Sequence, residues 1–216
     1  MAIERAGNIS AADFLPRNRS LEALREAAKS CKGCDLYLNA TQTVFGDGPG
    51  HASVMLVGEQ PGDIEDQKGE PFVGPAGRML DRALEDARIS RDQVYVTNAV
   101  KHFKWIWRGK RRLHQKPSVR QVVACRPWLE VEIEAVQPHI LVCMGATAAQ
   151  SVVGKPVAIM KERGKFIDSL LGRLTFITIH PSAILRQRDD EREQEYRRFA
   201  SEIKLVKRKL QSLSAA

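Results

Sequence analysis

The four cysteines of the chain are spaced like the ligands of a metal centre. Cys31 and Cys34 form a C-x2-C pair, and Cys125 and Cys143 follow singly much further along the chain. Thiolates bind zinc or iron–sulfur clusters in fours, and the fold can bring distant ligands to a close pair. A disulfide framework suits short secreted chains, and buried unreactive cysteines are the other alternative. We expect a four-cysteine metal site, for which the spacing alone leaves zinc and iron–sulfur open.

A carboxylate, an amide and an imidazole follow three apolar runs that are expected to be buried strands. Glu59 lies in Gly58-Glu59-Gln60-Pro61-Gly62, Asn98 ends the second run, and His180 begins His180-Pro181-Ser182. Ligands bind beyond the carboxyl ends of parallel strands, so these groups should meet in one crevice. There they can perform acid–base chemistry and read a hydrogen-bonding heterocycle. Taken singly, Glu59 could cap a helix, Asn98 could close a turn and His180 could be a core histidine.

The segment between Asp92 and Glu130 contains no acidic residue and is strongly basic. A solvated face normally mixes charges of both signs, so this segment indicates a phosphate-binding surface. His114 ends the sequence Lys110-Arg111-Arg112-Leu113-His114, and taken alone it would be a loop histidine that touches phosphate. The basic side chains of the segment are Lys101, Lys104, Arg108, Lys110, Arg111, Arg112, Lys116, Arg120 and Arg126.

Alternating apolar runs and helical patterns predict the fold that positions these groups. The runs indicate buried parallel strands, and amphipathic stretches indicate helices between them. We expect strands over 53–57, 94–97, 140–144 and 174–179, and helices over 18–30, 76–88, 118–135, 146–153 and 189–210. This alternation predicts an α/β fold, a single-domain three-layer α/β/α arrangement with a central four-stranded parallel sheet. The domain would cover 1–216, with 1–17 as a flexible N-terminal extension and 101–117 as a basic loop.

Composition limits the class of protein. A length of 216 residues with 43% apolar content is enough for one domain with a substantial core. The longest apolar run, Ile140 to Ala149, is too short to span a bilayer, and no apolar signal core follows Glu4 and Arg5. We therefore expect a soluble cytoplasmic protein without a membrane partner. Gly46, Gly48 and Gly50 precede a strand instead of following it, which argues against a nucleotide cofactor.

Together these motifs resemble the iron–sulfur uracil-DNA glycosylases of family four. The resemblance is specific and runs from about Cys31 to Arg186. The motifs that carry it are those of Glu59, Asn98 and His180 together with Gly69-Glu-Pro-Phe72-Val-Gly74-Pro75-Ala-Gly77. Ordinary members have Ala or Gly at the position of Gln60. The combination of Gln60 with a basic loop ending in histidine is similar to the X-type subgroup (UdgX), whose loop reads Lys-Arg-Arg-Ile-His. Trp105 and Trp107 lie outside that pattern; the two alternatives for them are stacking on DNA bases and packing of the loop, and packing is the preferred interpretation.

The resemblance implies a uracil-DNA glycosylase-like fold, a [4Fe–4S] cluster and a pocket for a base drawn out of the DNA stack. Phe72 would stack on uracil, Asn98 would hydrogen-bond its edge, and His180 would stabilise negative charge on the departing base. The implied uracil-binding residues are Gln60, Gly62, Asp63, Phe72, Asn98 and His180. The implied DNA contacts are Lys110, Arg111, Arg112, Ser182 and Arg186, and the implied cluster ligands are Cys31, Cys34, Cys125 and Cys143.

The X-type resemblance further implies that His114, in place of water, attacks the sugar and leaves the protein attached to abasic DNA. Glu59 would stabilise the oxocarbenium-like sugar or take the proton of the nucleophile. The expected substrate is uracil-containing DNA, preferably single-stranded, bound by a monomer. The alternatives are a turnover glycosylase that uses water and a non-catalytic iron–sulfur DNA-binding protein. A nucleotide-dependent redox enzyme would need the glycine fingerprint that the chain lacks.

Overall fold

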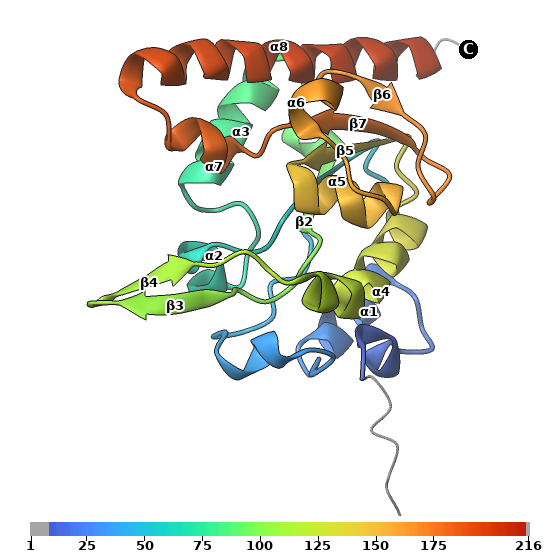
Figure 1. Cartoon of the computed structure of the whole chain (residues 1–216). Helices are drawn as coiled ribbons and strands as arrows, with labels where there is room; N and C mark the ends of the chain where they lie inside the picture. Colours follow the sequence, from blue (N-terminus) through green and yellow to red (C-terminus); the bar gives the residue numbers. More distant parts are fainter. Residues whose placement is uncertain (1–8, 215–216) are drawn as a thin grey trace, which may run out of the picture.

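Short runs of β-branched and other apolar residues form the central sheet, because such side chains suit a pleated surface that is buried on both faces. The computed structural model describes residues 9–214, and its main sheet has the strand order β2-β1-β5-β7-β6 (Figure 1). The first four strands run parallel, whereas the short β6 pairs antiparallel with β7. The strands are β1 (Val54–Gly58), β2 (Val94–Asn98), β3 (Trp105–Arg108), β4 (Arg111–His114), β5 (Ile140–Met144), β6 (Phe166–Ile167) and β7 (Leu174–Thr178).

Helices cover both faces of this sheet. The α-helices are α1 (Leu21–Ala28), α2 (Asp63–Lys68), α3 (Pro75–Asp86), α4 (Val119–Val136), α5 (Ala146–Val153), α6 (Ile159–Glu162), α7 (Pro181–Leu185) and α8 (Asp189–Ser214). Three short 3-10 helices are η1 (Ala11–Phe14), η2 (Asp35–Leu38) and η3 (Arg91–Gln93). Helix α4 begins at Ser118, whose side chain forms a capping box with Gln121.

Alternate residues of β1 face the two helical layers. Val54 and Leu56 pack with α3 and α8 on one face. Met55 and Val57 pack with α4 and α5 on the other. Successive side chains of a strand point to opposite faces, so a strand without a polar face is buried between two layers. The structure thus confirms the predicted three-layer α/β/α architecture.

Two features of the strands differ from the prediction. The four parallel strands form as expected, but β6 adds a fifth strand at the edge beside β7. The predicted basic loop over 101–117 contains a two-stranded hairpin, in which β3 pairs antiparallel with β4. Gly109, the first of its two turn residues, has a φ of +60°. A glycine at this place is typical of a type II′ turn, which matches the twist of the flanking strands.

Part of the expected N-terminal extension is folded. Ser10 caps η1 through a capping box with Asp13, and Ala11 is buried in a cluster that includes Trp128 of α4. The rest of that extension, 1–8, lies outside the described residues. Within 9–214, no helix combines the length and apolar character that crossing a membrane requires.

Candidate active site

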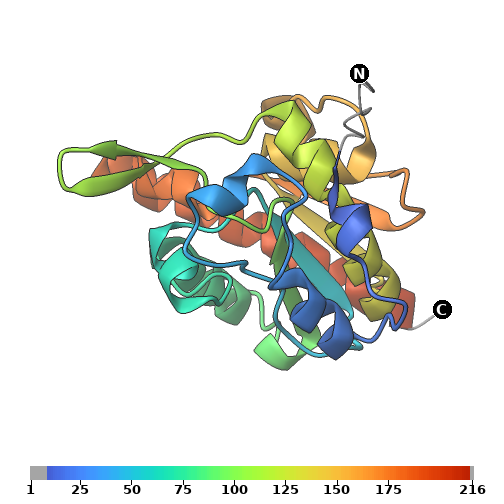
Figure 2. The same cartoon turned by 90° about the horizontal axis from the view of Figure 1, so that it is seen from below.

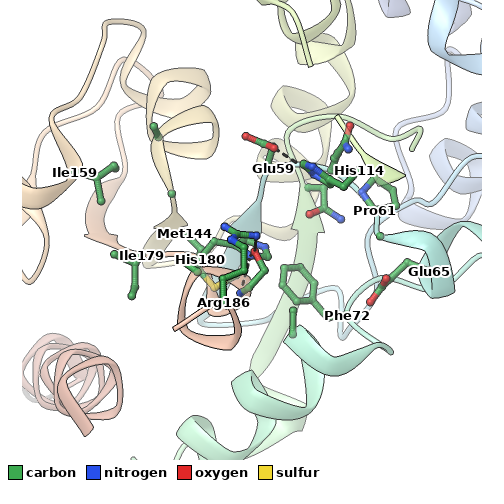
Figure 3. Close-up of a pocket in the computed structure, with 18 residues that line it drawn as sticks. Glu59, Pro61, Glu65, Phe72, His114, Met144, Ile159, Ile179, His180 and Arg186 are labelled. Carbon is green, nitrogen blue, oxygen red and sulfur yellow. Dashed lines mark hydrogen bonds and ion pairs between the residues drawn. The ribbon is translucent and has the colours of Figure 1, made fainter. Parts of the chain in front are cut away.

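The carboxyl ends of the parallel strands surround a cavity of about 410 Å³ (Figure 3). Glu59 follows β1, Asn98 ends β2 and His180 follows β7, and all three line the cavity. A volume of this size is typical of small-molecule pockets. The structure therefore brings together the carboxylate, amide and imidazole that the strand pattern places at one edge of the sheet.

Gly58 lies where three pocket side chains converge. A Cβ atom on Gly58 would lie 2.3 Å from Oδ1 of Asn98, 2.8 Å from Cζ of Phe72 and 3.3 Å from Nε2 of His180. No side chain fits in this space, so glycine is required at the end of β1. The close approach also shows that the amide, the aromatic ring and the imidazole share one small volume.

Phe72 is held in the pocket by an unusual backbone conformation. Its φ is +58°, which is uncommon for a residue other than glycine, and its side chain is buried. A Cβ on Gly77 would lie 1.6 Å from the Phe72 carbonyl oxygen, so α3 can approach this loop only through a glycine. The Phe72 ring lies 5.9 Å from the His180 ring, tilted by 32°. Such locally strained residues cluster at functional sites.

Asn98 is anchored through its backbone, while its amide group faces the pocket. The Nζ of Lys101 donates to the Asn98 carbonyl oxygen at 2.8 Å, and Lys101 forms a fully buried ion pair with Glu132. The Asn98 side chain makes no hydrogen bond with any residue in 9–214. Its donors and acceptor are therefore available to a ligand, which suits a group that reads the edge of a base.

His180 is a neutral imidazole in this site. Burial lowers its pKa to about 4, although the charge of Glu59 opposes the shift. The Ser182 backbone N–H donates to Nδ1 of His180 at 3.2 Å, so Nδ1 is the acceptor and Nε2 carries the proton. The Ser182 hydroxyl also lies 2.8 Å from Nδ1. The geometry leaves an N–H donor that points toward Gly58 and the cavity.

Glu59 lies between His114 of the hairpin and Thr147 of α5. Its Oε1 is 3.4 Å from Nε2 of His114, and the Thr147 hydroxyl donates to Oε2. Burial favours the protonated acid, but the bonds to His114 and Thr147 outweigh burial and hold the pKa of Glu59 below its ordinary value. Glu59 is therefore a carboxylate at neutral pH, and the half-exposed His114 is its neighbour across the pocket mouth.

The side chain of Gln60 holds the base of the hairpin. Its amide nitrogen donates to the carbonyl oxygens of Lys104 (3.2 Å) and Gln115 (3.1 Å), and its oxygen accepts from the Lys104 N–H at 3.1 Å. Lys104 precedes β3, and Gln115 follows His114. Gln60 lines the cavity, but its side chain serves the hairpin and not the pocket centre. Gly62 lines the cavity as expected from the sequence.

Arg112 fixes the hairpin to α2. Its Nε lies 2.5 Å from Oδ1 of Asp63, its Nη1 lies 2.6 Å from Oδ2 of Asp66, and its side chain is only 13% exposed. Charge-assisted hydrogen bonds to two separate carboxylates hold the guanidinium group in one orientation. Asp63, expected at uracil, instead binds Arg112 and does not line the cavity. Arg112, expected either to hold the loop against the site or to contact a phosphate of the DNA, anchors the strand that carries His114.

The other expected DNA contacts are divided between the hairpin tip and the pocket rim. Lys110 and Arg111 are exposed at the turn of the hairpin. Ser182 orients His180, while Arg186 lines the cavity and donates to the Ser182 hydroxyl at 3.3 Å. The expected DNA contacts therefore lie at two places, the turn of the hairpin and the rim of the pocket.

Three of the four cysteines lie together in one cluster. Cys31 and Cys125 share a buried cluster, and Cys34 packs against it. Burial raises the pKa of Cys125 to about 12, with Lys101 opposing the rise and the other two cysteines adding to it. The Trp128 indole donates to Sγ of Cys31 at 3.2 Å, and the Lys101 backbone N–H donates to Sγ of Cys125 at 3.3 Å. Hydrogen bonds to the sulfurs are a feature of iron–sulfur sites.

Cys143 is not brought to this group. It lies in the middle of β5, fully buried, with its side chain among residues of α4 and α5. Cys143 lies on the face of the sheet that α4 and α5 cover, away from the other three thiols. The expected set of four cysteines is therefore not assembled. Within 9–214, no three His, Cys, Asp or Glu side chains surround a point where a single metal ion would bind.

His102 is next in the chain to Lys101, whose backbone N–H donates to Sγ of Cys125. Its Nε2 is 2.9 Å from the Thr43 hydroxyl, which donates to the carbonyl oxygen of Ala28 at the end of α1. Its Nδ1 is buried and has no hydrogen-bond partner among the described residues. A buried polar atom without a partner is unfavourable unless something binds it. Three thiols and one orphaned imidazole nitrogen form a donor set that fits an iron–sulfur cluster, because histidine can replace cysteine as a cluster ligand.

The sequence reasoning missed two residues of this site, Thr147 and His102, and the role of a third, Gln60. Thr147 follows the strand end at Gly145 and is thus found by the same rule that gave Glu59 and Asn98. His102 carried a weaker signal, a histidine in a segment that already pointed to function. No local sequence pattern indicates that Gln60 bonds to the base of the hairpin, because its partners lie 44 and 55 residues away.

Comparison with known proteins agrees with the site. The profile of the Uracil DNA glycosylase superfamily matches residues 45–204. The chain is 39% identical to the type-4 uracil-DNA glycosylase of Thermotoga maritima over 81% of this chain and 88% of that protein. It is 34% identical to the type-4 enzymes of Sulfurisphaera tokodaii (77% of this chain, 76% of that protein) and of Archaeoglobus fulgidus (77% and 83%). The chain therefore belongs to the uracil-DNA glycosylase superfamily and, within it, to the type-4 uracil-DNA glycosylases.

Proposed function

We propose that this protein excises uracil from DNA and captures the resulting sugar covalently on His114. The observation that carries the proposal is the pair formed by His114 Nε2 and Glu59 Oε1, 3.4 Å apart at the mouth of a pocket that also holds Asn98, Phe72 and His180. A nucleophile beside a carboxylate base, next to a base-reading pocket, has the parts that this reaction requires.

The pocket supplies groups that bind a flipped pyrimidine and stabilise its departure. Phe72 offers a ring face for stacking, and the Asn98 amide offers both a donor and an acceptor. When the glycosidic bond breaks, the base leaves with the bonding electron pair. The Nε2–H of His180 then donates to the negative charge that develops on it, as a preorganised donor.

The sugar left behind is oxocarbenium-like, and the Glu59 carboxylate stabilises its positive charge. The unprotonated ring nitrogen of His114 forms a bond to the sugar carbon, which makes an imidazolium. The other ring nitrogen then gives its proton to Glu59, which restores a neutral imidazole, and the departed base acquires a proton from solvent. The product is DNA joined to the protein through one carbon–nitrogen bond.

The experiment that tests this proposal is a denaturing gel with single-stranded DNA that contains one uracil. A band of reduced mobility that survives denaturant is the expected result, and the same strand with thymine is the control. Release of uracil without this band would support the alternative in which water is the nucleophile. Binding without release of uracil would support a non-catalytic DNA-binding protein and overturn the proposal.

We further infer that Cys31, Cys34, Cys125 and His102 hold the iron–sulfur cluster, with Cys143 outside the ligand set. The buried sulfurs and the orphaned Nδ1 of His102 support this assignment. When bound, the cluster would supply iron–ligand bonds that tie α1 and α4 to the segment between β2 and the hairpin. Its role would then be to hold the hairpin in place, and the chemistry would belong to Glu59 and His114.

Single substitutions distinguish a ligand set of four cysteines from one of three cysteines and His102. Cys125→Ala is expected to lose most of the iron and the visible absorbance of the purified protein, because one ligand of the cluster is removed. Cys143→Ala is expected to retain both, and His102→Cys should retain them with an altered spectrum. Iron content and absorption spectra of anaerobically purified protein give the answer. Loss of iron in Cys143→Ala with retention in His102→Ala would contradict the assignment.

Thr147 is expected to set the pH dependence of the reaction through Glu59. Its hydroxyl donates to the carboxylate and favours the charged form, so Thr147→Val should raise the pKa of Glu59. The acidic limb of the uracil-release rate then moves to higher pH, while Thr147→Ser, which keeps the hydroxyl, leaves it in place. The measurement is a pH profile of single-turnover rates, and identical acidic limbs in Thr147→Val and the wild type would refute the role of Thr147.

A further inference from the structure

The β3–β4 hairpin projects from the body of the protein and carries its most exposed tryptophan. Both views of the chain show the hairpin extending away from the central sheet (Figure 1, Figure 2). The Trp107 side chain is 64% exposed, and its neighbour Ile106 is 52% exposed. Exposing an indole to water is unfavourable, so its place at the tip of a projecting hairpin calls for an explanation.

The register of the hairpin relates Trp107 to the catalytic histidine. Trp105 pairs with His114, and Trp107 pairs with Arg112. Residues two apart in a strand share a face, so Trp105, Trp107, Arg112 and His114 lie on the same face of the hairpin. Trp107 lies about 7 Å beyond the Trp105–His114 pair along the strand. That distance suits a group next to the nucleotide that reacts at His114.

Trp105 packs against Trp107 and is itself held in place. The Trp105 indole donates to the carbonyl oxygen of Asn39 at 2.9 Å, and the Arg112 guanidinium lies 5.3 Å from its ring centre. The Trp107 ring packs edge-on against Trp105, with the ring centres 4.9 Å apart and the planes at 82°. Trp105 is therefore a packing residue, whereas Trp107 contacts it on one side and remains 64% exposed.

The charge around Trp107 is of one sign. Arg108, Lys110 and Arg111 surround the tip, and none of them forms an ion pair with another residue in 9–214. Arg112, the remaining cation, is already bound to two aspartates. An exposed aromatic face within a purely cationic rim complements a strand that carries bases and phosphates, because every base has a face for stacking.

We propose that Trp107 stacks on an unpaired base adjacent to the excised uracil and thereby selects single-stranded DNA. The proposal rests on the proposed function, since it requires the uracil nucleotide to lie at His114. In a duplex, that adjacent base is held by its pairing partner and by the neighbour on its far side, so it cannot swing out to meet an indole on the protein surface. In a single strand the base is available, and Arg108, Lys110 and Arg111 contact the phosphates on either side.

The test combines a protein substitution with a DNA substitution. The probe is a short single strand with one 2′-fluoro-deoxyuridine, whose glycosidic bond resists cleavage, and equilibrium affinity is measured by fluorescence anisotropy. Trp107→Ala should bind this strand about 10-fold more weakly, Trp107→Phe should lose less, and binding to the matching duplex should be unchanged. The control is Leu170→Ala, which removes an equally exposed apolar side chain away from the hairpin and should change nothing.

A base-free nucleotide placed on the 5′ or the 3′ side of the uracil identifies the stacked base. On one side of the uracil, removal of the base should weaken binding by the wild-type protein. The same removal should not weaken binding by Trp107→Ala any further, because both changes delete the same contact. Additive losses on both sides, equal losses on single and double strands, or no loss at all would overturn the proposal. The last result would direct attention to a protein partner for this surface.

The same series keeps the two proposals apart. A parallel strand with thymine in place of the uracil analogue reports uracil recognition independently of stacking. If both strands bind equally but still depend on Trp107, the proposed function fails while the stacking surface stands. If the uracil analogue is preferred and Trp107 has no effect, only the stacking surface fails.

Discussion

Replacing His114 with alanine is expected to abolish the denaturant-resistant adduct between the protein and uracil-containing DNA. The imidazole is the nucleophile in the proposed reaction, and no other described residue places a ring nitrogen beside Glu59 within the pocket mouth. Release of uracil is expected to continue in this variant, because alanine leaves space in which water can approach the sugar next to the carboxylate. The variant should therefore turn over, and a denaturing gel together with an assay of free uracil measures both effects.

His139→Ala is the matched control for this substitution. His139 is exposed and lies at the opposite end of the sheet, just before β5, so its loss should leave adduct formation unchanged. An adduct that persists at wild-type level in His114→Ala would show that another residue is the nucleophile. Loss of both adduct and uracil release, in a variant that still binds uracil DNA, would make His114 part of the excision step itself.

Glu59→Gln is expected to slow uracil release and adduct formation together, by about 10²- to 10⁴-fold. Glutamine keeps the size of the side chain and can still accept a hydrogen bond from Thr147, but it carries no charge. The oxocarbenium-like sugar then lacks its negative neighbour, and the proton of His114 has no acceptor. Single-turnover rates with saturating protein measure the loss without interference from DNA binding.

Glu70→Gln serves as the control for this change of charge. Glu70 is an exposed carboxylate on the loop before Phe72 and does not line the active-site cavity, so its replacement should leave both rates unchanged. A Glu59→Gln protein that excises uracil at the normal rate but forms adduct slowly would restrict Glu59 to a role as base. Normal rates for both steps would remove Glu59 from the mechanism.

Much of the fold could be predicted because its elements have strong local patterns. The parallel strands are continuous apolar runs of about five residues, and the helices between them are amphipathic, so the two periods separate cleanly. The hairpin was harder to predict from the sequence. Its stability depends on Arg112 reaching Asp63 and Asp66, which lie 49 and 46 residues away, and no local pattern contains such contacts.

The site was predictable to the extent that it follows from the sheet. Glu59, Asn98 and His180 converge because the carboxyl ends of parallel strands meet, and this rule needs no knowledge of side-chain packing. The proposed ligands of the cluster, in contrast, could not be predicted in this way. Spacing along the chain does not tell whether the side chain of Cys143 reaches Cys125, whereas its burial among apolar residues of α4 and α5 shows where it packs. Packing also showed the orphaned nitrogen of His102.

The most direct test of the central claim is the amount of free uracil released when single-stranded uracil DNA is in large excess over wild-type protein. If His114 captures the sugar, release should stop at about one uracil per active protein molecule, since each event consumes its nucleophile. Release that continues linearly through many equivalents would contradict covalent capture and assign the attack to water.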